Sequence, residues 1–355
     1  MSEGLRLASG HTALSLVGEE LEQQQKAFLG YSPVGLVRLT PGRWLFPASY
    51  TKYADKLYNT KFRGSDVVVM TYPKCGTTWM QEIVWTMRNN PDLTHPMARL
   101  PLNARSPYLE LDMLLELGKP SQEFRAVLEA KLRRLAPGVE PQEGIVMQLA
   151  EAAPDPRTIK THLPPSLLTP DLLDTAKVVY VARNPKDVCM SYYHHSRIFN
   201  AHGFVGSFNQ FVQFLIDDDL LYGPYLEHVR EAWVKREHPN MLFLFYEDLK
   251  TDIMGQLHKL NNFLGTSLTQ HQLQQVAHYT SFPEMQRREE QSTAKDTTVK
   301  LNMELVKKHG GLFRKGEVGN WKEHLTSTQE AEIDLWTKKN ILNLGLEFKY
   351  SGSKV

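Results

Sequence analysis

Cysteines, long apolar runs and an excess of one charge sign are all missing from this sequence. Among its 355 residues only Cys75 and Cys189 are cysteines, so a disulfide framework is excluded beyond one bond, which suits a reducing compartment. No apolar run approaches the roughly 20 residues of a membrane-spanning helix, and the opening MSEGLRLASG lacks the apolar core of a secretory signal peptide. These absences predict a soluble, cytoplasmic protein that does not enter a membrane.

The charges are balanced, with 41 Lys and Arg against 40 Asp and Glu. This balance argues against a protein built for bulk nucleic-acid binding, which needs a basic surface. Hydrophobic residues make up 41% of the chain and charged residues 23%, an ordinary globular composition. We therefore expect a folded protein without a nucleic-acid partner.

Short apolar runs alternate with helical patterns along most of the chain. Because strands separated by helices form βαβ units, we predict an α/β fold, a single domain with a central, mostly parallel sheet flanked by helices. The expected strands are residues 67–71, 177–182 and 241–246, with a shorter run at 159–160, and the expected helices are residues 78–89, 121–135, 187–198 and 255–264.

The stretch YPKCGTTW, residues 72–79, joins the first expected strand to a helix. Such a turn directs free backbone N–H groups and the positive end of the helix dipole to one point, which favours an anion. Lys74 adds a full positive charge, and Gly76 lets a bulky anion approach the backbone. The hydroxyls of Thr77 and Thr78 add hydrogen-bond donors. The sequence therefore predicts a phosphate site, although the G-x-x-x-x-G-K-[ST] pattern is absent.

Trp79 follows this turn and offers a flat face on which a nucleobase can stack. The plain alternative is an ordinary strand–helix turn in which Lys74 is solvated and Trp79 lies in the core.

A second segment, residues 178–199, repeats the order strand, polar turn, helix. Arg183 stands at the carboxyl end of the strand, where open α/β sheets bind ligands, and its planar fork suits a phosphate. Ser191 follows eight residues later. The alternative is that Arg183 only forms a structural ion pair with Asp187. A third segment, FRKG at residues 313–316, places two cations beside a glycine, although such pairs are usually solvated.

Together these segments resemble the cytosolic sulfotransferase family, whose sulfuryl donor is 3′-phosphoadenosine 5′-phosphosulfate (PAPS). YPKCGTTW is similar to the family's P-loop-like 5′-phosphosulfate loop, with Cys75 where serine is common. VARNPKDVCMSYYH is similar to its 3′-phosphate segment, and RKGEVGNWK to its C-terminal loop. IKTHLP, residues 159–164, resembles the catalytic stretch. Residues 227–248 are most similar to insect members, including the retinol dehydratase branch.

The resemblance implies a role for each matching residue. His162 would be the general base for the acceptor hydroxyl, because an imidazole titrates near neutrality. Lys74 would contact the bridging oxygen and leaving phosphate, and Lys160 the sulfuryl oxygens. The family needs no metal, and we expect none. The donor, and its product adenosine 3′,5′-bisphosphate, would be bound by Lys74, Cys75, Gly76, Thr77, Thr78, Trp79, Arg183, Ser191, Tyr246, Thr280, Ser281, Phe282, Phe313, Arg314, Lys315 and Gly316.

The sulfotransferase domain is expected to span residues 41–350, after a loosely packed lead-in over residues 1–40. Residues 90–156 would form a lid over the acceptor, which we expect to be a small hydrophobic alcohol or phenol of detoxifying metabolism. His194 and His195 are interpreted as ordinary core or surface histidines, although the position of His194 would also allow it to lie near the acceptor pocket. Candidate aromatic residues of the acceptor pocket are Tyr108, Phe199, Phe204 and Phe208.

The family's dimer motif, K-x-x-x-T-V-x-x-x-E, is degenerate in this chain. Lys322 and Thr326 are kept, but Ser327 replaces the valine and Ala331 the glutamate. The resemblance implies a homodimer, whereas these replacements weaken that expectation.

Three other functions compete with simple sulfuryl transfer. A dehydratase of the retinol type would sulfonate an allylic alcohol and then eliminate sulfate. A nucleotide kinase or other P-loop NTPase is disfavoured by the missing phosphate-loop pattern and by the lack of an obvious carboxylate cluster for Mg²⁺. A non-catalytic nucleotide-binding protein is disfavoured because both Lys74 and His162 are retained.

Overall fold

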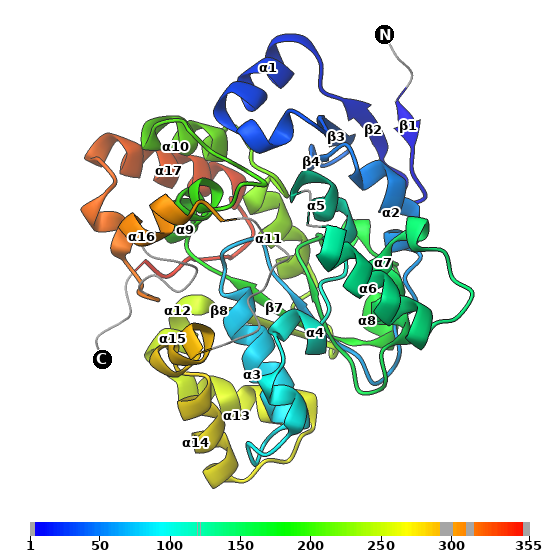
Figure 1. Cartoon of the computed structure of the whole chain (residues 1–355). Helices are drawn as coiled ribbons and strands as arrows, with labels where there is room; N and C mark the ends of the chain where they lie inside the picture. The colour runs from blue at the N-terminus through cyan, green and yellow to red at the C-terminus, as the bar shows by residue number, and fades with distance from the viewer. Residues whose placement is uncertain (1–3, 119, 121, 292–300, 310–315, 351–355) are drawn as a thin grey trace.

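A computed structural model of the chain describes residues 4–118, 120, 122–291, 301–309 and 316–350. A parallel sheet lies at its centre, with strand order β6-β5-β7-β8 and helices on both sides (Figure 1). This arrangement confirms the predicted α/β fold. The strands are β5 (Val67–Met70), β6 (Thr158–Thr161), β7 (Lys177–Ala182) and β8 (Met241–Phe245).

The helices follow the predicted order, with small shifts at their ends. The α-helices are α1 (Gly18–Ala27), α2 (Tyr50–Tyr58), α3 (Thr77–Asn89), α4 (Leu102–Arg105), α5 (Leu111–Gly118), α6 (Gln122–Leu135), α7 (Ile145–Ala152), α8 (Leu172–Thr175), α9 (Pro185–Ile198), α10 (Phe208–Ile216), α11 (Tyr225–Val234), α12 (Tyr246–Thr251), α13 (Ile253–Leu264), α14 (Gln270–Tyr279), α15 (Phe282–Gln291), α16 (Met303–His309) and α17 (Ser327–Asn340). The 3₁₀ helices are η1 (Leu29–Tyr31), η2 (Pro96–Arg99), η3 (Pro141–Glu143), η4 (Pro165–Leu167) and η5 (Asn320–Glu323).

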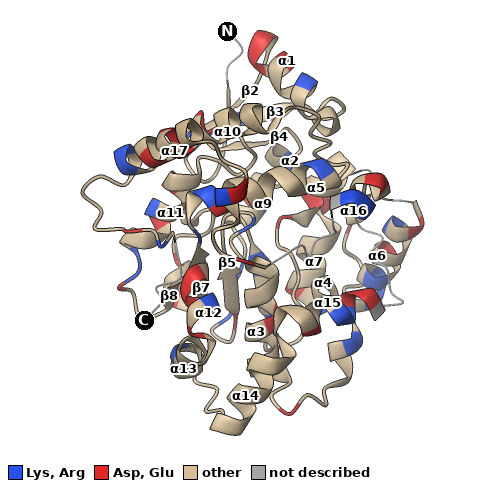
Figure 2. Ribbon diagram, turned by 90° about the vertical axis from the view of Figure 1, so that its left-hand side faces the viewer, with Lys and Arg blue, Asp and Glu red and all other residues tan. Residues whose placement is uncertain are grey.

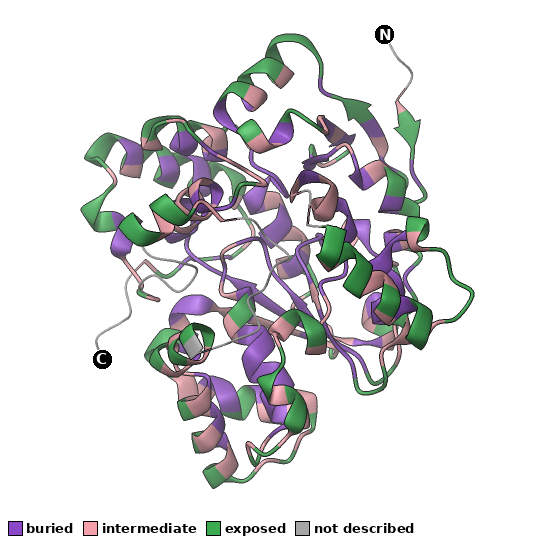
Figure 3. Ribbon diagram, in the orientation of Figure 1, coloured by how far each residue is buried: buried purple, intermediate pink, exposed green. Residues whose placement is uncertain are grey.

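The central strands are apolar on both faces because each face is covered. Val67 and Val69 of β5 belong to a core shared with α3, α13 and α14. Val68 and Met70 point the other way, into a larger core that includes α9, α10 and α11. Buried residues accordingly gather along the strands and on the inner sides of the surrounding helices (Figure 3).

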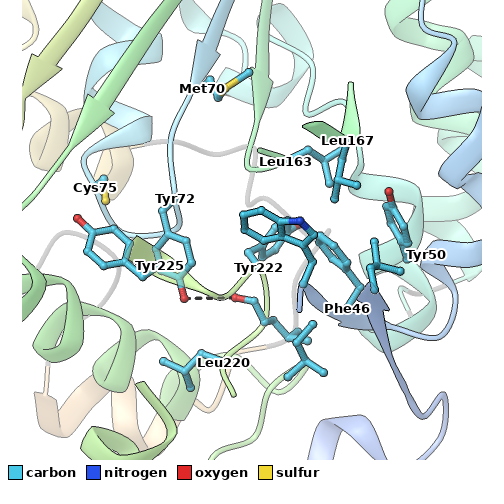
Figure 4. Packing of buried hydrophobic residues seen from close by; sticks show 14 of the residues in the cluster. Phe46, Tyr50, Met70, Tyr72, Cys75, Leu163, Leu167, Leu220, Tyr222 and Tyr225 are labelled. Carbon is cyan, nitrogen blue, oxygen red and sulfur yellow. Dashed lines mark hydrogen bonds between the residues drawn. The ribbon is translucent and has the colours of Figure 1, made fainter. Parts of the chain in front are cut away.

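The N-terminal residues differ from the loosely packed lead-in that the sequence predicts. β1 (Leu5–Arg6), β2 (Thr12–Ser15), β3 (Leu36–Thr40) and β4 (Leu45–Pro47) form an antiparallel sheet in the order β1-β2-β3-β4. Leu36, Leu39 and Phe46 are at most 1% exposed. Phe46 stacks on Tyr50 at a centroid distance of 4.4 Å (Figure 4). The segment is therefore part of the large core.

Residues 90–156 divide into two parts. The first part, which ends with α5, reaches the cavity described below. In the second part, α6 and α7 pack on each other around Leu132, Ile145 and Leu149. Asp112 of α5 holds the second part, because its carboxylate accepts hydrogen bonds from backbone N–H groups at the start of α7, including that of Ile145 at 2.8 Å.

The surface carries both signs of charge. Basic and acidic residues alternate along helices such as α6, α15 and α17 (Figure 2). None of the helices in the described part of the chain is long and apolar enough to cross a membrane.

Candidate active site

The turn between β5 and α3 forms a cradle that only glycine fits at its last position. Gly76 is the residue before α3 and has φ of +96°, a left-handed conformation that side chains disfavour. A Cβ atom there would lie 2.6 Å from Cδ2 of Tyr246. The aromatic ring and the glycine backbone are therefore in close contact, and both line a large cavity. The first N–H groups of α3 begin at this point, as an anion site requires.

Thr77 connects the cradle to the histidine that the sequence predicts as the base. Its hydroxyl lies 2.6 Å from the hydroxyl of Thr71, the residue that follows β5. The hydroxyl of Thr71 lies 3.3 Å from Nδ1 of His162, and its carbonyl oxygen lies 2.8 Å from the same nitrogen. Thr71 thus contacts both the anion cradle, through Thr77, and the imidazole of His162.

His162 has a defined tautomer. Because a carbonyl oxygen only accepts hydrogen bonds, Nδ1 carries the proton and Nε2 keeps a free lone pair. The ring lies between Tyr108 and Tyr222, at centroid distances of 5.3 and 5.5 Å. Burial, with the charge of Lys160 nearby, lowers the pKa of His162 well below its ordinary value. The imidazole is therefore neutral at physiological pH and able to accept a proton.

Two lysines line the same cavity as His162. Lys160 precedes it by two residues on β6 and places its ammonium 3.9 Å from the ring centroid of Tyr108. Nζ of Lys74 lies 3.4 Å from Nδ1 of His195. Of the two neighbouring histidines, His195 lines the cavity and His194 does not, because neighbouring residues of α9 point to different sides of the helix.

Arg183 lies at the carboxyl end of β7, beside the cradle. Its guanidinium donates to the carbonyl oxygens of Lys74 at 3.3 Å and Glu317 at 2.9 Å, and stacks 4.3 Å from the ring centroid of Tyr246. Asp187 is 4.0 Å away, so the ion pair is loose. Buried Nε of Arg183 has no hydrogen-bond partner among the described residues. A cavity-lining guanidinium with one unpartnered N–H suits a phosphate, and Ser191 on the next helix lines the cavity too.

The aromatic residues predicted for adenine gather around the cradle. Trp79 meets Tyr246 at 5.7 Å with an interplanar angle of 71°. Trp79 lines the cavity and does not lie wholly in the core. Gly316 adjoins Phe282, because a Cβ atom at Gly316 would lie 2.5 Å from that ring. These residues, with the exposed Thr78, fit a bound nucleotide.

Three of the predicted donor-binding side chains do not line the cavity. Cys75 is buried, and burial raises the pKa of its thiol to about 12. The hydroxyl of Thr280 donates to the carbonyl oxygen of Val276 at 2.8 Å, and Ser281 also lies outside the cavity lining. They support the backbone around the site. Phe313, Arg314 and Lys315 lie outside the described residues.

The cavity measures about 1960 Å³ and extends well beyond the cradle. Of the four aromatic candidates, Tyr108 and Phe199 line this cavity. Phe204 instead packs in a buried aromatic cluster with Phe28, and Phe208 packs on Tyr193. The apolar side chains of the lining outside the cradle, here called the far end, are Leu111, Leu114, Leu115, Leu117, Met190, Ala201, Leu301 and Met303.

Sequence reasoning missed several residues of the site. Thr71 and Tyr222 contact the base, and Lys250 lines the cavity with its ammonium 5.6 Å from the ring centroid of Trp79. Thr71 directly precedes YPKCGTTW, so its position at a strand end is a usable signal. Tyr222 and Lys250 come from distant segments, and their sequence context carries no such signal. Among the described residues, no group of His, Cys, Asp and Glu is arranged to hold a metal ion.

Comparisons with known proteins agree on one class. A family model described as the sulfotransferase domain matches residues 64–345. The luciferin sulfotransferase of Photinus pyralis is 30% identical over 296 residues, covering 82% of this chain and 76% of that protein. Sulfotransferase 1A1 of Mus musculus is 34% identical over 305 residues, covering 85% and 92%. A crystal structure of retinol dehydratase in a complex with retinol and PAP has a TM-score of 0.78 at 30% identity, covering 96% of this chain and 99% of that chain.

The fold and these comparisons thus define a group-transfer enzyme. The chain belongs to the sulfotransferase family and is a sulfotransferase enzyme. PAPS is the sulfuryl donor that this membership implies.

Proposed function

We propose that the protein transfers the sulfuryl group of PAPS to a hydroxyl of a small hydrophobic alcohol or phenol. One observation carries the proposal: the anion cradle and the neutral imidazole line one cavity and are joined through Thr71. A donor held by its phosphates at the cradle would present its reactive end toward His162. The apolar far end of the cavity would hold the acceptor.

His162 acts as the general base. An alcohol or phenol is a weak nucleophile at neutral pH, so its proton must leave as the new bond forms. Nε2 is the acceptor, since Nδ1 is committed to the carbonyl oxygen of Thr71. The hydrogen bond to this carbonyl oxygen stabilises the positive charge that then develops on the ring.

The lysines stabilise the charge that moves during transfer. PAPS supplies the sulfuryl group and, in adenosine 3′,5′-bisphosphate, a phosphate leaving group. Lys74 stands on the cradle and neutralises the leaving phosphate, while Lys160, beside His162, attracts the sulfuryl oxygens. Both ammonium groups approach the cavity from the strand ends, so the charge is positioned before the substrates arrive.

Arg183 and Ser191 hold the 3′-phosphate, with Gly316 beside them. The unpartnered Nε of Arg183 provides a donor for this purpose. Trp79, Tyr246 and Phe282 enclose the adenine. The parts assigned to Arg314 and Lys315 rest on the sequence resemblance.

The direct test is to incubate the purified protein with labelled PAPS and a panel of phenols, steroids, retinoids and amines, and to read product masses. We expect a sulfated hydroxyl product. No transfer to any acceptor, despite tight binding of adenosine 3′,5′-bisphosphate, would favour a non-catalytic binding protein instead.

A second candidate is sulfonation followed by elimination. The likeness to retinol dehydratase over 96% of the chain favours it, and so does the wall of leucines that α5 contributes to the far end of the cavity. Product mass separates the two reactions, because elimination yields an acceptor that has lost water and carries no sulfate.

The remaining parts of the proposal concern the setting of the enzyme. We expect it to act in the cytoplasm on small molecules, as in detoxification. The protein would form a homodimer through residues 322–331. Lys322, Ser327 and Ala331 are exposed and thus accessible to a second copy, whereas the hydroxyl of Thr326 caps α17 by accepting from the N–H of Gln329 at 3.3 Å. Light scattering across a concentration series tests it.

A further inference from the structure

A short extended segment, residues 107–110, runs beside the catalytic strand β6. The N–H of Leu109 donates to the carbonyl oxygen of Lys160 at 2.9 Å, and the N–H of Lys160 donates to the carbonyl oxygen of Pro107 at 2.8 Å. Tyr108 and Lys160 form a parallel bridge. The segment thus acts as an additional strand at the edge of the central sheet, beside the residues assigned to catalysis.

Glu110 ends this segment, and its carboxylate holds the turn that carries His162. One oxygen accepts from the backbone N–H of His162 at 2.6 Å, and the other accepts from the hydroxyl of Thr161 at 2.9 Å. That hydroxyl in turn accepts from the N–H of Leu163 at 3.0 Å. Glu110 is only 1% exposed, so its bonds are shielded from water.

We propose that Glu110 is a positioning residue for sulfuryl transfer, because its carboxylate fixes the backbone of residues 161–163 and thereby the place of the His162 ring. This inference rests on the proposed role of His162 as the base. The imidazole is then held at two points, by Thr71 through Nδ1 and by Glu110 through its own peptide N–H. A base held at two points keeps Nε2 in line with the acceptor, and small displacements of such a group are costly.

The ionised carboxylate is the form that serves this purpose. It accepts both bonds, whereas a protonated carboxyl group has one oxygen that must donate. Burial raises the pKa of Glu110 to about 7, although the bonds from His162 and Thr161 and the charge of Lys160 oppose this rise. The other groups that face the carboxylate are Tyr108 and, from other elements, Tyr50 and Tyr222.

The position of Glu110 also relates the base to the acceptor. α5 begins at the next residue, Leu111, which lines the far end of the cavity. An acceptor in contact with Leu111 is therefore one residue away from Glu110, whose carboxylate holds the backbone of His162. The segment from Pro107 to Leu111 therefore connects the far end of the cavity to the turn that carries His162.

The test compares Glu110→Gln with Asp112→Asn in the full-length enzyme. Asp112 is a matched control because it is also buried, lies two residues away and bonds backbone N–H groups, but those of α7. We expect Glu110→Gln to lower kcat by roughly 10- to 100-fold, as misplacement of a catalytic group does, with little change in affinity for adenosine 3′,5′-bisphosphate. Both variants should lower the melting temperature by a similar amount. The kcat of Asp112→Asn, however, should stay within about twofold of the wild-type value.

Two further measurements separate positioning from simple loss of stability. The kcat of the wild-type enzyme should fall as pH drops through about 7, where Glu110 is protonated, and this acid limb should be absent in Glu110→Gln. Thr161→Val should also lower kcat, and the double variant should be no slower than Glu110→Gln, because both changes break one network.

The inference is overturned if Glu110→Gln keeps wild-type kcat, or if it loses kcat only as much as Asp112→Asn does, with an unchanged pH profile. The proposed function fails separately, if His162→Ala retains wild-type turnover. A result in which His162→Ala is inactive and Glu110→Gln is fully active would leave the function intact and remove Glu110 from it.

Discussion

Replacing Gly76 by alanine tests the cradle, because the structure assigns two distinct costs to the new methyl group. The first is backbone strain, since φ is +96° at this position. A non-glycine residue in the left-handed region costs roughly 1–2 kcal/mol. The second is a collision, because the Cβ atom would lie 2.6 Å from Cδ2 of Tyr246, well inside contact distance.

The collision is the part that bears on the donor. The ring of Tyr246 must move away from the cradle to make room for the methyl group. This movement disturbs the guanidinium of Arg183, which stacks 4.3 Å from the ring centroid. A cation–π contact of this kind contributes roughly 0.5–2 kcal/mol, and the ring is itself assigned to the adenine. Since 1.4 kcal/mol corresponds to a factor of ten, we expect affinity for adenosine 3′,5′-bisphosphate to fall about 2- to 30-fold.

Gly265 supplies the matched control. It also has positive φ, at +72°, but a Cβ atom there would meet nothing within 4 Å. Gly265→Ala should therefore lower the melting temperature by a few degrees through strain alone, and Gly76→Ala should lower it at least as much, read by calorimetry, because the collision adds to the strain. Only Gly76→Ala should weaken nucleotide binding, read by isothermal titration. Wild-type affinity in Gly76→Ala, or equal loss in both variants, would refute the reasoning.

Four further outcomes follow from the same geometry. His162→Ala should lower kcat by roughly 10²- to 10⁴-fold, as loss of a general base does, while product nucleotide still binds; high residual turnover would contradict the assignment. Arg183→Ala should raise the KM for PAPS about tenfold or more and leave the KM for the acceptor unchanged, since a charged hydrogen bond contributes roughly 1.5–3 kcal/mol. Thr71→Val should lower kcat, because the hydroxyl beside Nδ1 of His162 is lost, without moving the acid limb of the pH profile, because Glu110 does not bond Thr71. Dialysis against a chelator should leave turnover unaltered, and a loss restored by Mg²⁺ would argue for phosphoryl chemistry.

Much of the central fold can be predicted from the sequence because the strands are buried on both faces. Residues 177–182 are apolar except at their first position, and β7 has these bounds. The helices start earlier than predicted where a polar residue caps them. Asn184 accepts from the N–H of Asp187 at 2.8 Å, so α9 begins at Pro185. Asp252 likewise accepts from Gly255 at 2.8 Å, so α13 begins at Ile253.

The N-terminal sheet is harder to predict because its pairing is not local. β2 and β3 pair across the polar helix α1, so that Thr12 lies opposite Thr40. Leu5 and Leu14 are exposed at 54% and 43%, so the apolar pattern of these strands does not mark the core face. Only the contact with the rest of the protein, for example of Phe46 with Tyr222 at 5.4 Å, shows that the sheet is integral to the fold.

The register of the central sheet explains why some of the site can be anticipated and some cannot. Met70 of β5 pairs with Thr161 of β6, so the residues that follow, Thr71 and His162, leave the sheet side by side. Lys160 is two residues before His162 on an extended chain, and both therefore face the cavity. A slip of one residue would exchange the two faces of β6 and send His162 into the core. The residue types indicate the chemistry, but the pairing of β5 with β6 brings His162 next to the anion cradle. This pairing cannot be predicted from the sequence of either strand alone.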